Sequence, residues 1–216
     1  GNTGEPRNGS NVPNSQTNWS VAIQDIPPSG ANGDLTWTAT PGIVYDVYYS
    51  DSDPAGNMSW QYQGRVTADG SAESLNVPES PKRYYKVVPA GESPNKIGLW
   101  GVIKPTVAAN SYTMLSAPLD ITDRSMSGEL GDALKAVLSN GDKVFAMTAG
   151  GGWLTITLSG GNWDTAYTFA EGEGFFVERT GGAVTPRFTG PVGNDGASSR
   201  TINGAVAGRW NIIGPS

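Results

Sequence analysis

The sequence contains no histidine and no cysteine. The missing histidine excludes a Ser-His-Asp or Cys-His nucleophile, a histidine-ligated zinc and the usual proton shuttle at neutral pH. The missing cysteine excludes disulfides, so the sequence gives no indication of the redox compartment. We therefore expect a protein that is not an enzyme. Catalysis would require a deep pocket that encloses two or three carboxylates.

Charge is also scarce in this chain. Charged residues make up 16% of it, the formal net charge is -6, and the 14 basic residues form no cluster. Nucleic-acid binding needs clustered Lys and Arg, so we exclude it. No apolar run reaches the length of a transmembrane helix, so we expect no membrane insertion. The chain begins at Gly1 without a signal peptide, which favours the mature form of a secreted, extracellular or cell-surface protein.

Glycine, proline and aromatic residues are abundant. The 30 Gly and 15 Pro indicate many turns and little helix, whereas 7 Trp, 8 Tyr and 5 Phe suffice for two modest cores. A length of 216 residues allows two domains of ordinary size. We therefore predict an all-β chain of two tandem antiparallel domains, over residues 19–98 and 99–216, preceded by an arm at 1–18.

The arm is rich in Gly, Asn, Ser and Pro and has almost no apolar side chains. A segment of this composition orders only when it is held by its own domain or by a neighbouring copy. Both alternatives stay open. The residues that we expect to make an intermolecular contact are Asn2, Arg7, Asn11, Val12 and Asn14.

Short alternating segments follow the arm, each bounded by turn residues. Such a series predicts an antiparallel sandwich. The predicted strands are 19–23, 35–39, 43–49, 59–63, 74–77 and 83–88. This half resembles a fibronectin type III or related immunoglobulin-like domain, on the motifs Leu35-Thr36-Trp37, Tyr45-Asp46-Val47-Tyr48, 75–78 and Tyr84-Tyr85-Lys86-Val87-Val88-Pro89-Ala90. The resemblance implies a core Trp beside a Tyr of the next strand and an extracellular role, but no activity.

An apolar run at 97–104 joins the two halves without a linker rich in Pro or Ser. It predicts a strand that ends the first domain and leads directly into the second, so that the joint is tight. Its joint residues are Ile97, Leu99, Trp100 and Val102.

The second half predicts a β-rich sandwich or barrel with one short helix over about 127–139, whose apolar positions Leu130, Leu134, Val137 and Leu138 share one face. Ser125 or Ser127 is its expected N-cap. The segment 111–119 predicts a buried strand. Gly181-Gly182 predicts a primed hairpin turn between strands 174–180 and 183–188.

The second half also resembles an uncharacterised β-rich module of secreted bacterial surface proteins. The motifs that carry this resemblance are Gly152-Trp153, Gly160-Gly161-Asn162-Trp163, Glu173-Gly174-Phe175-Phe176 and Trp210-Asn211-Ile212-Ile213-Gly214.

Three groups of residues are candidates for chemistry. The oxygen-rich loop of Asp51, Asp53 and Asn57 suits calcium, although ordinary Asx turns explain the same residues. Otherwise we expect no cofactor. The pair Glu171 and Glu173 suits glycoside hydrolysis, yet a solvated turn explains it more simply. The aromatic candidates for a sugar-stacking platform are Trp60, Tyr62, Trp153 and Trp163, whose alternative role is to fill cores or subunit joints, as we expect for Trp37 and Trp210.

Two functions fit these observations, of which we predict the first and keep the second as the alternative. The first is a secreted structural subunit that assembles with other copies of itself into a filament, sheath or surface layer through the arm. The second is a carbohydrate-binding or adhesive module of a bacterial surface protein, with glycans as partners. Exposure of Trp60 or Trp163 on a concave surface would favour the second. Asn8, Asn18 and Asn57 begin Asn-x-Ser triplets, which matter only if the source glycosylates them.

Overall fold

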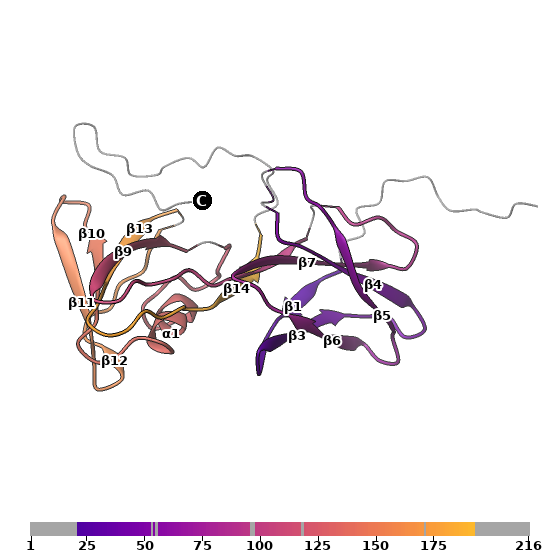
Figure 1. The fold of residues 1–216 in the computed structure, drawn as a ribbon, viewed down its shortest axis with the longest axis horizontal. Coiled ribbons are helices and arrows are strands. Elements are labelled where there is room, and N and C mark those ends of the chain that lie inside the picture. The colour runs from indigo at the N-terminus through magenta and orange to yellow at the C-terminus, as the bar shows by residue number, and fades with distance from the viewer. Residues whose placement is uncertain are drawn as a thin grey trace, which may run out of the picture.

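The computed structural model describes residues 21–52, 54, 56–95, 98–117, 119–170 and 172–192. These residues form three antiparallel sheets and one short helix (Figure 1), which confirms the predicted all-β class. None of the helical segments described is long and apolar enough to cross a membrane.

Two of the sheets pack face to face as a sandwich. One contains β1 (Ile23–Asp25), β2 (Pro28–Ser29), β3 (Asn32–Thr38) and β6 (Ala72–Pro78). The other has the order β14-β8-β7-β4-β5 and contains β4 (Val44–Ser50), β5 (Gln61–Thr67), β7 (Lys82–Pro89), β8 (Trp100–Ile103) and β14 (Phe188–Pro191). Inward residues alternate with outward ones along β3, as expected for a strand with one buried face.

The core between these two sheets contains the aromatic pair that the family resemblance predicts. Trp37 is fully buried, and its ring lies 6.2 Å from that of Tyr45 in an edge-to-face arrangement. Tyr84 and Tyr85 are both buried, on opposite faces of β7. Tyr85 belongs to the sandwich core, whereas Tyr84 packs into the core of the second half. The outer face of this sheet is therefore covered as well.

The third sheet has the order β12-β11-β10-β13-β9. Its strands are β9 (Ser111–Ser116), β10 (Lys143–Met147), β11 (Trp153–Ser159), β12 (Asn162–Trp163) and β13 (Gly174–Arg179). The helix α1 (Glu129–Lys135) buries Leu130 and Leu134 against Phe175 and Val177 of β13, in one core. Figure 1 shows α1 on the side of this sheet that faces the first sandwich.

The helix is shorter than the predicted 127–139, and its predicted serine cap is wrong. Gly128 is the N-cap residue and makes no side-chain cap. The Glu129 carboxylate instead accepts hydrogen bonds from the backbone amides of Thr122 and Asp123, at 3.2 and 3.4 Å. This interaction ties the start of the helix to the preceding loop.

The predicted hairpin across Gly181-Gly182 is also wrong. β13 pairs with β10 and β9, while residues 183–187 leave the sheet and lead to β14, which pairs with β8 of the first sandwich. Pro186 lacks the amide that a paired strand needs. The two-glycine hairpin occurs at Gly160-Gly161, where both φ angles are positive, as a primed turn requires.

The joint between the halves is built by a strand pair. β8 and β14 lie after the predicted domain boundary between residues 98 and 99, yet both belong to a sheet whose other strands lie before that boundary. Gly101 of β8 permits close packing, since a Cβ there would lie 2.6 Å from Leu119 Cδ2. Leu99 and Val102 are buried, and Ile97 lies outside the described residues. The two domains stay a prediction, but their described parts share a sheet and a core.

Candidate binding sites

The face of the third sheet opposite α1 exposes a cluster of large side chains. Because directly paired residues of antiparallel strands share a face, the register fixes its members. We call this cluster the aromatic face: Tyr112, Met114, Phe145, Met147, Trp153 and Phe176. Tyr112 is 60% exposed and Trp153 51%. The predicted buried strand at 111–119 is thus buried on one side only.

The rings of the aromatic face lie close together. Trp153 of β11 lies 5.7 Å from Phe176 of β13, and Tyr112 of β9 lies 5.8 Å from Phe145 of β10. Neighbouring strands are about 4.8 Å apart, so the cluster extends about 14 Å across four strands. This spacing produces a continuous apolar strip.

The charge beside this strip is balanced. Lys143 Nζ lies 3.0 Å from Glu178 Oε2, one row from Phe145. The hydrogen bond from Lys143 lowers the pKa of Glu178, and the same bond raises the pKa of Lys143. Both groups therefore stay charged and paired at neutral pH.

The four predicted platform aromatics do not lie together. Trp153 belongs to the aromatic face. Trp163 is half-buried and donates its indole N–H to the Gly131 carbonyl at 3.1 Å. Tyr62 is 55% exposed on the edge strand β5, where its ring lies 5.8 Å from Tyr48, and Trp60 beside it is half-buried.

The predicted calcium loop is partly engaged by other groups. Arg83 binds both oxygens of Asp51 at 2.8 and 2.9 Å, and the Ser80 hydroxyl donates to one of them at 3.1 Å. Asn57 is exposed, and Asp53 lies outside the described residues. Among the residues that the structure describes, no three acidic side chains cluster to hold a metal ion. Calcium binding here stays a prediction.

The other predicted sites are only partly covered by the structure. Glu173 accepts hydrogen bonds from the Tyr167 hydroxyl and the Ala170 amide, both at 2.7 Å, which gives this carboxylate a structural role. Glu171, Trp210 and the arm residues Asn2, Arg7, Asn11, Val12 and Asn14 lie outside the described part of the chain, as do Asn8 and Asn18.

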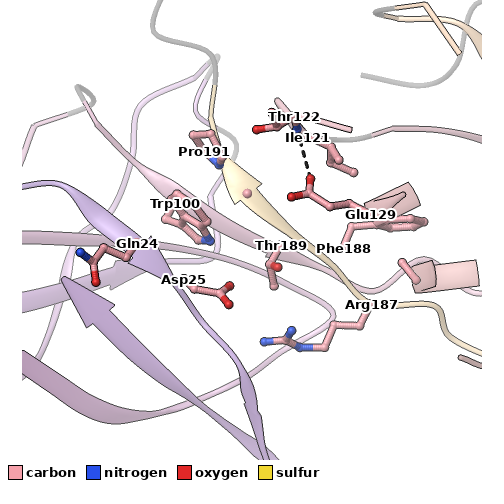
Figure 2. A pocket seen from close by; sticks show the side chains of 12 residues that line it. Gln24, Asp25, Trp100, Ile121, Thr122, Glu129, Arg187, Phe188, Thr189 and Pro191 are labelled. Atoms are coloured by element: carbon pink, nitrogen blue, oxygen red, sulfur yellow. Dashed lines mark hydrogen bonds between the residues drawn. The ribbon is translucent and has the colours of Figure 1, made fainter. Parts of the chain in front are cut away.

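A second candidate site is a pocket of about 320 Å³ between the first sandwich and α1 (Figure 2). Its floor is β14, and its walls come from β1, β8, the loop before α1 and α1 itself. We call it the joint pocket. The polar side chains that line it are Gln24, Asp25, Trp100, Thr122, Glu129, Arg187 and Thr189.

The Arg187 side chain is held by a buried carboxylate. Glu79, whose side chain is 2% exposed, accepts from Arg187 Nε at 2.9 and 3.2 Å and lies 2.5 Å from Lys104 Nζ. Arg187 also donates to the Ile26 carbonyl, next to Asp25. Burial alone would raise the pKa of Glu79, but the hydrogen bonds from Arg187 and Lys104 outweigh it, and the pKa is lowered. Glu79 therefore stays ionised and fixes the pocket wall.

Sequence reasoning missed most of these residues. Asp25, Glu129 and Thr189 are about 60 to 160 positions apart, and no local motif connects them. The sequence pattern could have indicated Tyr112 and Met114, because they alternate with Ser111 and Thr113, as expected for a strand whose two faces differ. Comparisons with known protein families, with characterised proteins and with solved structures found no match for this chain.

Proposed function

We propose that this chain is an extracellular, non-catalytic carbohydrate-binding module of a surface protein, and that the aromatic face holds the glycan. The observation that carries the proposal is the exposure of Tyr112 and Trp153 on an open sheet face, with Phe145 and Phe176 between them. Flat rings suit the apolar C–H faces of pyranose units because both surfaces lose water on contact. Thr155 and Thr157 on the same face supply hydroxyls for hydrogen bonds to the sugar.

The charge of the chain favours an uncharged glycan. Among the described residues beside the strip, Lys143 and Glu178 neutralise each other, while the Asp164 carboxylate, which accepts a hydrogen bond from the Thr157 amide, adds a negative charge. The chain carries a net charge of -6. A polyanionic glycan would be repelled at long range and would find no unpaired cation on this face. The open face that the described strands form suits the middle of a long polysaccharide chain or the surface of packed chains.

The size of the aromatic face argues against a second copy of the chain as the occupant. The strip is about 14 Å wide and about four residues long, which corresponds to an area of roughly 200 Å². A stable protein interface buries about 800 Å² on each partner. A strip of this size instead matches a few sugar units.

The first sandwich supports an immunoglobulin-like or fibronectin type III-like assignment, with a role as a rigid support. β1, β3 and β6 face β8, β7, β4 and β5, an order compatible with that family, and β14 is an added edge strand. The support and the binding sheet are joined by a shared core, so the aromatic face would be presented at a fixed angle.

The self-assembly hypothesis rests on residues 1–18, and no feature of the described residues favours it over glycan binding. Electron microscopy of the full chain, beside a version without residues 1–18, tests it directly. Regular polymers that disappear on deletion would establish assembly, and dispersed particles in both samples would exclude it.

Depletion assays with insoluble cellulose and chitin test the proposed function. We expect the full chain to bind at least one of these neutral polymers. Trp153→Ala and Tyr112→Ala should each weaken binding about tenfold, or about 1.4 kcal/mol, within the range for one aromatic contact. Tyr62→Ala is the matched control, because Tyr62 is as exposed as these residues but lies on β5. Equal loss in the control, or full binding by both variants, would refute the proposal.

A further inference from the structure

We propose that the joint pocket is a second binding site, which takes one uncharged, hydroxyl-rich ligand of the size of a sugar unit. This site is separate from the aromatic face, and the inference does not depend on the proposed function. Its volume of about 320 Å³ lies at the lower end of the range for small-molecule sites.

The first indication is an unpaired donor. The Trp100 indole nitrogen is buried and has no hydrogen-bond partner among the described residues. Figure 2 shows this nitrogen on the side of the ring that faces Asp25 and Thr189. A buried N–H without a partner costs about 1–3 kcal/mol. Because the nitrogen is closed to solvent in this structure, a ligand oxygen removes that cost only when the Trp100 ring shifts toward the pocket.

The second indication is the free edge of β14. The Val192 N–H donates to the Leu99 carbonyl at 2.9 Å. Because hydrogen-bonded positions alternate along an antiparallel strand, residues 190 and 188 also direct their backbone N–H and C=O groups toward β8. Thr189 then points its N–H and C=O away from β8, as does Pro191, whose carbonyl accepts from the Asp120 amide. No hydrogen bond to the Thr189 backbone groups is present among the described residues. The pocket floor therefore offers one donor and one acceptor.

The third indication is a pair of carboxylates on opposite walls. Asp25 uses one oxygen to accept from the Ile26 amide at 2.7 Å, and Glu129 uses one oxygen to accept from the Thr122 and Asp123 amides. The second oxygen of each carboxylate makes no hydrogen bond within the described chain. Both oxygens are available as acceptors in the pocket.

This mixture of groups selects the class of ligand. Trp100 and Thr189 supply donors, while Asp25, Glu129 and the Thr189 carbonyl supply acceptors. A hydroxyl group both donates and accepts, so a molecule with several hydroxyls can satisfy all of them. A carboxylate or phosphate would meet two carboxylates, and Arg187, the only cation among the described residues of the lining, is already paired with Glu79. An ammonium would leave the two donors without partners.

Titration with methyl glucoside, followed by NMR of the tryptophan indole N–H groups in the full chain, tests the inference. Trp100→Phe assigns the Trp100 signal, which should shift and saturate in the wild type. Trp100→Phe and Glu129→Gln should each weaken binding about fivefold to tenfold, as expected for the loss of one hydrogen bond. Trp60→Phe is the matched control outside the pocket and should bind normally. Methyl glucuronide, the carboxylate counterpart, should bind at least about tenfold more weakly, because one added hydrogen-bond mismatch costs that much.

Three results would overturn the inference. These are an unshifted Trp100 signal, wild-type affinity in both folded variants, and equal affinity for methyl glucuronide. Glu129→Gln keeps the test valid if Trp100→Phe does not fold, because Glu129 is an exposed residue. A shift confined to the Trp153 signal would place the sugar on the aromatic face, which would overturn the inference and leave the proposed function intact.

Discussion

Replacing the buried carboxylate at the joint should show how tightly the two halves are coupled. Glu79 lies between β6 and β7 of the first sandwich, whereas Arg187 lies on the segment that returns from the third sheet to β14. The substitution Glu79→Gln retains the shape of the side chain and removes its charge. Lys104 and Arg187 are then left without their shared counter-ion.

The size of the effect follows from burial. The Glu79 side chain is 2% exposed, and the side chains of Arg187 and Lys104 are 21% and 27% exposed. Removing one partner of a buried ion pair destabilises a protein by about 3–5 kcal/mol. Because the two cations retain some contact with water, we expect a value near the lower limit, about 3 kcal/mol. The exposed pair of Asp132 and Lys135 provides the control, since Asp132→Asn should cost less than about 1 kcal/mol.

Urea unfolding at several pH values measures this contribution. The pKa of Glu79 is lower in the folded protein than its ordinary value of 4.5. Its stabilisation is therefore complete above pH 4.5 and disappears as the pH falls through the folded pKa. The difference between wild type and Glu79→Gln should be largest at pH 7 and should shrink in acid. A difference below about 1 kcal/mol at pH 7, or one that is constant with pH, would refute the reasoning.

Two further substitutions test the core of the second half, and a third serves as their control. Asp142→Asn should lower the unfolding free energy by about 3–5 kcal/mol, because it leaves the buried Arg179 without its ion-pair partner. Hydrogen bonds lower the pKa of Asp142 despite its burial, so this loss of stability should also become smaller in acid. Gly131→Ala should destabilise α1 despite the higher helix propensity of Ala, since its Cβ would lie 2.0 Å from the Met126 carbonyl oxygen. Gly182→Ala meets no atom within 4 Å and should change stability by less than about 0.5 kcal/mol in the same urea experiments.

Local sequence patterns predicted most of the elements. The segment 74–77 was predicted as a strand and lies within β6, because its alternation reflects one buried face. Buried Trp37 and the apolar stripe of α1 were predicted for the same reason. Such patterns involve residues that are close together in the sequence, so the face that each element buries can be predicted from them.

The pairing of distant segments was not predicted. Residues 183–188 follow two glycines and look like the second arm of a hairpin, but Phe188 instead packs beside β8, about 85 residues earlier in the chain. That choice depends on packing at the joint, where the side chains of Leu119 and Tyr84 both lie close to Gly101. The joint pocket escaped prediction for the same reason, since it exists only after β14 has returned to the first sandwich.

The ion pair at the joint and the joint pocket depend on the same side chain. Arg187 lines the pocket, binds Glu79, and donates to the Ile26 carbonyl next to Asp25. Loss of the Glu79 charge frees the Arg187 guanidinium, which can then pair with Asp25 and occupy the acceptor that a hydroxyl would use. Glu79→Gln should therefore weaken methyl glucoside binding, whereas Asp142→Asn should lower stability and leave the affinity unchanged, because Asp142 lines no part of the pocket. NMR titration of both folded variants distinguishes these outcomes, and equal affinities would show that the pocket does not depend on the ion pair.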